Sequence, residues 1–424
     1  MTSGAGMNTQ VAGQDDAGWR NTILAAIANY IDAGSIVAGA ATLSIWVERY
    51  HLSTHFVGVL GAIGANAISA GIGAIIGGRL CDMFGRKKIY LANMAFYAIG
   101  MLWLVFAVTP WMIVVGFIQV GLAVGAAVPA SWSLIADQAP QGARGQRSGL
   151  AQVLWYFGPV VVLLMSLALM PLGLLGARIV FAHLAILAVV LMLLRSRMSE
   201  SERWIAAKVA AGSDSAKRPG AGELLRAKHL KSMAFLIGMY GAWNLWAGTN
   251  GFFLPYILHT VGAQTQAASV AFQALSFVVG ILSIIFVFMR LSDRVNQRLM
   301  FITASLIGIA GMSCLALFPL TTPVAFIYVV LTSFGGGFGA QPFFQLWSAE
   351  LFPTLLRSTA QGIAFAVVRI GLGFWSFFVP VLTATGFTTL AWLLTGFLAV
   401  SALIGAIWAP RNEGKSLEQI QAEI

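Results

Sequence analysis

Two charged side chains stand inside apolar segments that are long enough to cross a bilayer. Asp32 lies in the stretch NYIDAGSI, and Arg369 lies in FAVVRIGLG. Each is twelve residues beyond a basic residue at the end of its segment, Arg20 and Arg357 respectively. Twelve residues of helix rise about 18 Å, so both charges reach the middle of the membrane. A charge at that depth costs at least about 3 kcal/mol, so each must face water, a charged partner or a substrate.

The chemistry of these two residues leaves several interpretations open. Asp32 could be a proton-coupling carboxylate, a direct ligand for a polyol or a cationic substrate, or half of a structural ion pair. Arg369 has the planar fork of donors that suits a carboxylate or a phosphate. It could equally pair with Asp32 or with carbonyl groups at a helix end. The pair predicts a buried polar centre in a membrane protein.

Helices that span a membrane must position these residues. The chain has 424 residues, of which 58% are hydrophobic and 9% are charged. Continuous apolar runs of about 20 residues indicate transmembrane helices, because strands of a barrel would alternate. We expect twelve spans, at 22–46, 56–78, 89–108, 111–136, 149–171, 177–195, 233–258, 266–289, 299–318, 323–347, 360–382 and 387–408.

The basic residues indicate the orientation of the spans. With the N-terminus inside, all but three of the 25 Lys and Arg residues fall on the inner side, nine of them in 195–231. We expect a cytoplasmic tail (1–20), a six-helix half (21–196), a cytoplasmic linker (197–232), a second half (233–408) and a cytoplasmic tail (409–424). The first 18 residues do not resemble a signal peptide, and no Asn-x-Ser/Thr sequon is present. We therefore expect the first span to stay as a membrane anchor, and the lack of a sequon favours a bacterial protein, multi-pass in the inner membrane.

The two halves share a short turn after their second span. It reads GRLCDMFGRKK over 78–88 and RLSDRVNQR over 290–298. In each copy an Asp precedes basic residues. Gly85 permits the bend, and Asn296, at the matching position of the second copy, also tolerates left-handed backbone geometry. The repeat indicates an internal duplication.

The first turn resembles the signature between spans 2 and 3 of the major facilitator superfamily. Three further motifs are similar to those of its sugar porter family: ESERW at 200–204, ELFPTLLR at 350–357 followed by Gly362, and GKSLEQI at 414–420. The resemblance implies an all-α fold with twelve helices in two pseudo-symmetric halves, which rock to give alternating access. It also implies a cytoplasmic gate of ion pairs, for which helix-end capping is the alternative reading. The gate candidates are Asp82, Arg86, Asp137, Arg144, Asp293, Arg294, Glu350 and Arg357.

The same resemblance assigns roles at the centre. Proton-coupled sugar porters are similar in having an Asp in span 1, which favours proton coupling for Asp32. Their answering Arg in span 4 is replaced here by Phe117, so Arg369 is a candidate countercharge. Hydroxyl groups of a sugar need paired donors and acceptors, which amides provide. The substrate-binding candidates are Gln152, Asn244, Asn250, Gln345 and Arg369.

These patterns predict a secondary transporter that imports a small hydroxylated metabolite (a sugar, polyol or sugar acid) with protons. A proton symporter of organic anions is the alternative, and an exporter or a membrane sensor is less favoured. The sequence has no catalytic or metal-ligand spacing and no P-loop, so we expect no enzyme activity and no cofactor. The basic residues are spread over many loops, which argues against a nucleic-acid partner. We expect the transporter to work as a monomer in the lipid bilayer.

Overall fold

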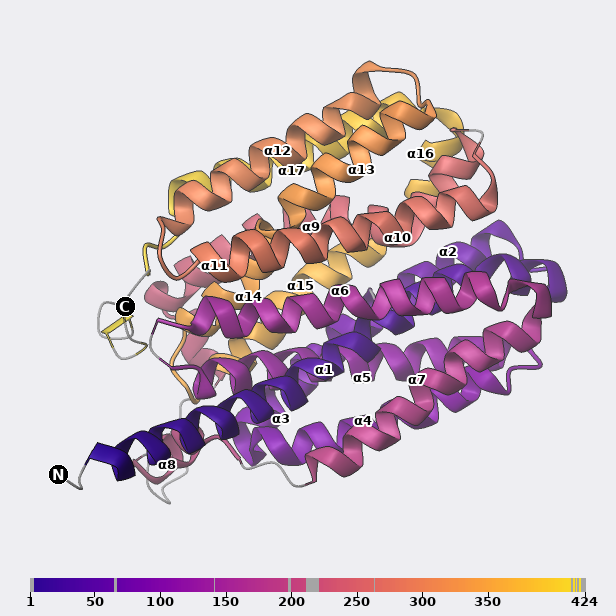
Figure 1. The fold of residues 1–424 in the computed structure, drawn as a ribbon. Coiled ribbons are helices and arrows are strands. Elements are labelled where there is room, and N and C mark those ends of the chain that lie inside the picture. The colour runs from indigo at the N-terminus through magenta and orange to yellow at the C-terminus, as the bar shows by residue number, and fades with distance from the viewer. Residues whose placement is uncertain are drawn as a thin grey trace.

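The computed structural model is a bundle of helices. It describes residues 4–64, 67–140, 142–196, 200–210, 221–262, 264–412, 415, 417 and 419–420. Figure 1 shows the first seven helices together on one side of the bundle and the helices from α9 onward on the other. The N- and C-terminal ends lie at the same end of the bundle. The expected fold of two helical halves is confirmed.

Seven α-helices form the first half: α1 (Gly4–Tyr50), α2 (Thr54–Ile63), α3 (Ile68–Phe84), α4 (Arg86–Val105), α5 (Pro110–Gln138), α6 (Arg144–Ala168) and α7 (Leu174–Arg195). A 3-10 turn, η1 (Met170–Leu172), joins α6 to α7. Helix α1 begins at Gly4, so the expected tail over 1–20 is largely helical. The expected linker is partly helical too, because it contains α8 (Glu202–Ala210) and the 3-10 helix η3 (Ala221–Leu225). The rest of the linker, at 197–199 and 211–220, lies outside the described residues.

The second half runs from α9 to α17. Its elements are α9 (Ala227–Thr260), α10 (Gln266–Ser283), the π-helical turn η4 (Ile284–Phe288), α11 (Met289–Leu291), α12 (Gln297–Leu317), α13 (Thr322–Gly337), α14 (Ala340–Glu350), α15 (Arg357–Ser376), α16 (Val379–Thr385) and α17 (Phe387–Trp408). Spans 2, 10 and 11 are each built from two helices, which sequence periodicity did not predict. Gly414, Ser416 and Glu418 of the closing motif lie outside the described residues.

Ten segments of the described chain are long and apolar enough to cross a membrane. Helices α9 and α15 complete the twelve expected spans. These two helices carry Asn244, Asn250 and Arg369 within their spans. The other candidate residues of the interior, Asp32, Gln152 and Gln345, lie within the ten apolar segments.

Local chemistry explains several helix ends. Pro110 opens α5, at a position whose N–H needs no helical partner. Gly85, between α3 and α4, has φ of +100°, as expected for the bend. Asn296, at the matching position of the second turn, has φ of −58°. Its side chain caps α12 by accepting from the Leu299 amide at 2.9 Å, so this residue does not use the left-handed geometry that it tolerates.

The two halves meet along α3 and α15 and along α6 and α10. The first of these contacts is close because small residues face each other. A Cβ atom at Gly78 would collide with the carbonyl oxygen of Ser358, and one at Gly362 with that of Ala74. Glycine at these positions lets the two backbones touch.

Candidate functional site

A small chamber lies between the two halves and contains part of the predicted substrate site. Its volume is about 40 Å³, enough for a few water molecules. Ala33 and Ile36 of α1 and Trp155 of α6 line it from the first half. The second half contributes its polar wall, which consists of Asn244, Gln341 and Arg369. Of the predicted binding residues, Asn244 and Arg369 thus reach one chamber.

Arg369 is held by contacts within the second half. Its Nη1 atom donates to Asn244 Oδ1 at 3.4 Å, and its guanidinium carbon lies 4.5 Å from the centroid of the Phe365 ring. Beside it, the Tyr240 hydroxyl donates to Gln341 Oε1 at 2.6 Å. The sequence analysis did not select Tyr240 or Gln341, although an amide within span 10 was a usable signal. The group offers both donors and acceptors to a ligand in the chamber.

Gln152 and Gln345 also meet, and their contact joins the two halves. The Gln152 Nε2 group of α6 donates to Gln345 Oε1 of α14, and both side chains are buried. Gln152 Oε1 and Gln345 Nε2 have no hydrogen-bond partner among the described residues, so both amides can offer bonds to a hydroxylated ligand.

Asn250 does not join this group. Its Oδ1 atom accepts from the Tyr328 hydroxyl at 2.6 Å, which ties α9 to α13 inside the second half. The structure therefore separates Asn250 from the other predicted binding residues.

Asp32 lies inside the first half and does not line the chamber. It is 2% exposed, and neither carboxylate oxygen has a hydrogen-bond partner among the described residues. It forms no ion pair with Arg369, which contacts Asn244 instead. Phe117, which stands where the family has an Arg, packs edge-on against Trp46 at 5.8 Å.

A cluster of buried charges closes the bundle at the end that holds both chain ends, called the charged end below. Asp137 of α5 is its centre. Arg357 of α15 donates to Asp137, and Arg86 of α4 lies 3.8 Å from it. The Ser201 hydroxyl, just before α8, donates to the same carboxylate at 2.7 Å. One carboxylate thus accepts hydrogen bonds from the second half and from the linker, and it also pairs with a cation of its own half.

Asp82 and Arg86 extend this cluster into the second half. Asp82 Oδ2 accepts from the amide and the hydroxyl of Thr359, both at 2.7 Å. Arg86 lies 3.4 Å from Asp82 and donates to the Thr354 carbonyl at 2.8 Å. The first shared turn of the sequence is therefore a contact between the two halves.

Arg144 and Glu350 form a second buried ion pair between the halves. The Arg144 guanidinium of α6 donates to Glu350 Oε1 of α14 at 2.8 Å. Glu350 Oε2 accepts from Asn412 at 2.9 Å, and Arg144 donates to the Lys415 carbonyl at 2.9 Å. The C-terminal segment therefore packs on this pair.

Asp293 of the second turn also binds the other half. Its carboxylate accepts from the Gly145 amide at 2.9 Å and from the Gln146 amide at 3.1 Å, at the start of α6. A carboxylate at a helix N-terminus is favourable. Burial raises the pKa of Asp293, and these amides and the Arg144 charge oppose the rise. Arg294 is exposed, so of the eight gate candidates it alone is not buried in or against the cluster.

Glu200, the first residue of the ESERW motif, also lies at the charged end. The sequence did not predict a role for it. Its carboxylate accepts from the backbone amides of Arg86 at 3.1 Å and Lys87 at 3.0 Å. It thereby caps α4 from the segment that follows α7. The Trp204 indole donates to the Asp82 carbonyl at 3.1 Å beside it. The ESERW motif thus fastens the linker to the first shared turn.

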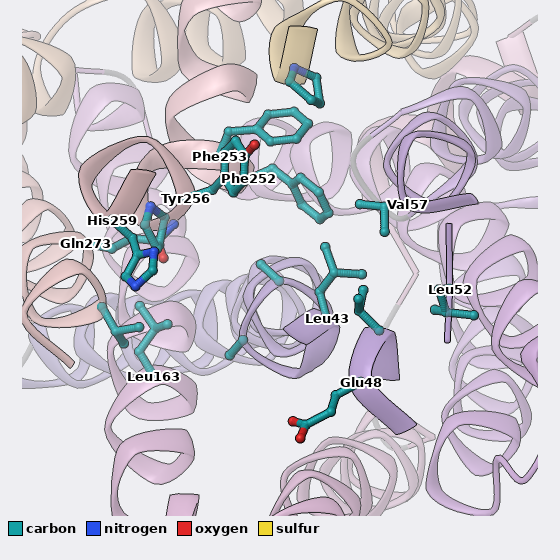
Figure 2. Close-up of a pocket in the computed structure, with 16 residues that line it drawn as sticks. Leu43, Glu48, Leu52, Val57, Leu163, Phe252, Phe253, Tyr256, His259 and Gln273 are labelled. Carbon is teal, nitrogen blue, oxygen red and sulfur yellow. The ribbon is translucent and has the colours of Figure 1, made fainter. Parts of the chain in front are cut away.

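The opposite end of the bundle is hollow. A cavity of about 430 Å³ lies there between α1 and α9, within the usual size range of a small-molecule pocket. Figure 2 shows Phe252, Phe253 and Tyr256 along one wall, with His259 and Glu48 on different sides. On both α1 and α9, the residues that line this cavity come later in the chain than those that line the chamber. The cavity thus lies beyond the chamber, on the side away from the charged end.

The described residues contain no group of three or more His, Cys, Asp or Glu that could hold a metal ion. The polar groups of the described interior include amides, hydroxyls, buried ion pairs, the guanidinium of Arg369 and the carboxylate of Asp32.

Comparison with known proteins gives concordant results. A family model described as the Major Facilitator Superfamily matches residues 22–376 and 249–423. The chain is 43% identical over 417 residues to the minor myo-inositol transporter IolF of Bacillus subtilis (strain 168), covering 97% of this chain and 95% of the relative. It is 24% identical to the glucose transporter GlcP of Staphylococcus epidermidis, with 83% and 86% covered. The solved structure of the proton:xylose symporter XylE bound to 6-bromo-6-deoxy-D-glucose matches with a TM-score of 0.82 at 18% identity, covering 97% of this chain and 99% of that one.

Proposed function

The chain belongs to the Major Facilitator Superfamily, and from this premise we propose that it imports a small polyol or sugar together with protons. It is a multi-pass membrane transporter whose relatives are likewise transporters. We propose a cyclic polyol of the inositol type as its substrate class, because IolF is named for myo-inositol and is similar along nearly the whole chain.

The observation that carries this proposal is the polar chamber between the halves. Arg369, Asn244 and Gln341 line it, and the Gln152–Gln345 pair crosses the same interface. A ring with several hydroxyl groups needs such alternating donors and acceptors, and aromatic side chains such as Trp155 can cover its apolar faces. A volume of about 40 Å³ is too small for such a ring, so binding requires the halves to separate at the centre.

Alternating access supplies that separation. In the proposed cycle, substrate enters the 430 Å³ cavity, replaces the Gln152–Gln345 bond, and draws the halves together at that end. The ion pairs at the charged end then break and release substrate on the other side. Because basic residues gather on the inner side of membranes, we assign the charged end to the cytoplasm. We propose the monomer as the working unit, since one chain contains both halves and the chamber.

Asp32 is the proposed proton carrier. It is a buried carboxylate with no hydrogen-bond partner among the described residues, so a change in its protonation is not blocked by a fixed donor. It lies one residue before Ala33, which lines the chamber, so changes there can reach it along α1.

A second candidate function is proton-coupled import of an organic anion such as a sugar acid. Arg369 in the chamber favours it, because guanidinium groups bind carboxylates through two parallel hydrogen bonds. The two candidates differ in the charge of the substrate.

Counterflow in proteoliposomes separates these candidates without a proton gradient. Vesicles are loaded with unlabelled myo-inositol, xylose, glucose or a sugar acid, and exchange of the labelled compound is measured. Exchange of myo-inositol in preference to the acid supports the first proposal. Exchange of the acid alone supports the second, and exchange of neither class refutes both.

A further inference from the structure

One tryptophan of the first half is packed into the second half. Trp132 of α5 is 2% exposed and lies edge-on against two rings, Phe344 of α14 at a centroid distance of 5.8 Å and Phe365 of α15 at 6.1 Å. Helix α5 packs against both of these helices. When the halves separate at this end, the indole must therefore leave both phenylalanine rings.

These three rings lie between the chamber and the ion pairs of the charged end. Phe365 is about one helical turn from Arg369, which lines the chamber. Phe344 is three residues from Gln341, which lines it too. Asp137, the centre of the buried charge cluster, follows the tryptophan on α5 by five residues, or about 8 Å. A substrate that leaves through the charged end has to pass this aromatic layer.

Packed side chains connect the aromatic layer to the polar wall of the chamber. The Phe344 ring stacks on Tyr240 at a centroid distance of 3.9 Å, and the Tyr240 hydroxyl donates to Gln341. The Phe365 ring lies 4.5 Å from the guanidinium carbon of Arg369. A ligand at either polar group is therefore linked, through side chains in contact, to the rings that hold the indole.

The indole N–H of Trp132 has no hydrogen-bond partner in the part of the chain that the structure describes. A buried donor without an acceptor costs about 1–3 kcal/mol, and such groups are rare in folded proteins. The equally buried indole of Trp347, by contrast, donates to Gln297 at 2.7 Å. The unused donor of Trp132 thus stands on the exit path, where a ligand with hydroxyl groups can supply an acceptor.

Other polar groups stand beside the indole on the same path. Ser133 donates to Gln361 of α15 at 2.7 Å and accepts from Ser358 at 2.9 Å. Both bonds join the two halves, so they too must break when the charged end opens. The opened path then presents hydroxyl and amide groups next to the indole N–H, which suits a ligand that carries many hydroxyl groups.

We propose that Trp132, Phe344 and Phe365 form a second substrate site, on the inner side of the chamber, which is exposed only when the charged end opens. In this site the Trp132 N–H donates to a hydroxyl group of the departing polyol, and the aromatic faces cover the C–H faces of its ring. In the present arrangement the two phenylalanines cover the indole, so it contributes nothing to binding from the opposite cavity. The inference rests on the proposed transport of a hydroxylated ring and adds the residues that the ring meets as it leaves.

Equilibrium binding of labelled myo-inositol to the purified transporter tests this site in two backgrounds. The native charged end keeps the indole covered, whereas Arg144→Gln removes one partner of the buried pair with Glu350 and favours opening. Trp132→Phe keeps an aromatic ring but has no N–H. In the Arg144→Gln background we expect it to raise the Kd about five- to tenfold, the effect of one lost hydrogen bond. With the native ion pair it should leave the Kd unchanged.

Trp246→Phe is the matched control. Its indole N–H also lacks a partner among the described residues, but the side chain packs within the second half. This change should leave the Kd unchanged in both backgrounds. Trp132→Leu, which also lacks the N–H, replaces Trp132→Phe if that variant does not fold.

A Kd that Trp132→Phe alters equally in both backgrounds, or in neither, overturns the inference. Failure of the proposed function gives a different result, because protein with the native Trp132 would then bind no myo-inositol in either background.

Discussion

Arg144 of α6 and Glu350 of α14 form a buried ion pair of 2.8 Å between the two halves of the transporter. Breaking a buried pair by removing one partner costs about 3–5 kcal/mol, because the remaining charge stays buried. That cost falls on the state in which the charged end is closed. The pair therefore stabilises the arrangement in which the opposite cavity is accessible.

Arg144→Gln should open the charged end more often. A cysteine at Ser358, a fully buried residue between the halves, reports this opening when Cys81 and Cys314 are replaced by serine. We expect a thiol reagent to label Ser358→Cys at least about tenfold faster when Arg144→Gln is added. Arg226→Gln is the control, because its ion pair with Glu223 is exposed at the surface. Equal labelling rates with and without Arg144→Gln would contradict the gate role.

The pair of amides at the centre predicts a coupled effect on affinity. Gln152→Ala and Gln345→Ala should each raise the KM for the substrate, by about tenfold for a lost hydrogen bond. Since each residue is the partner of the other, the double variant should lose less than the product of the single losses. Uptake kinetics of the three variants measure this. Fully multiplicative losses would mean that the two amides act independently. Asn250→Ala, in the Tyr328 contact, should change KM much less.

The predicted role of Arg369 depends on the planar arrangement of its guanidinium donors. Arg369→Lys keeps the charge but loses the planar pair of donors, so a role in binding hydroxyl groups predicts a raised KM for both Lys and Gln variants. If the substrate is an anion, Lys should instead retain much of the affinity that Gln loses. Counterflow with myo-inositol and with a sugar acid distinguishes these results. No change in either variant would make Arg369 a structural residue.

The shared turn predicts a specific loss of stability. Gly85 has φ of +100°, and a Cβ atom there would collide with the Glu200 carboxylate that caps α4. Gly85→Ala should therefore destabilise the protein by at least about 1–2 kcal/mol. Gly142→Ala is the control, since Gly142 also has positive φ, +73°, but no neighbour within 4 Å of the added atom. Thermal unfolding of both variants in detergent measures this difference. A larger loss of stability in Gly142→Ala than in Gly85→Ala would contradict this explanation.

The elements predicted from the sequence were those with local signals. Hydropathy gave the twelve spans, and the turn with Gly85 followed from the short spacing of its charged residues. The gate candidates Asp82, Glu350 and Arg357 stand in motifs that resemble those of the family, so their place at one end of the bundle could be expected.

The contacts that were not predicted depend on how the helices pack. Arg195 is one of nine basic residues in 195–231, and only the position of α7 against α4 shows that it points inward. Asn250 lies six residues after Asn244, so the helical period turns its side chain about 120° away, to where it meets Tyr328. Which neighbouring helix each of these two faces contacts depends on the packing of α9, which the sequence alone does not fix.

The central claim is that Asp32 couples substrate import to protons. Its most direct test is uptake of labelled myo-inositol into proteoliposomes, with and without an inward proton gradient, by wild type and by Asp32→Asn. We expect the gradient to drive wild-type accumulation above the external concentration, and Asp32→Asn to equilibrate the substrate without concentrating it. Wild-type uptake that does not respond to the gradient, or Asp32→Asn that still concentrates the substrate, would contradict the account.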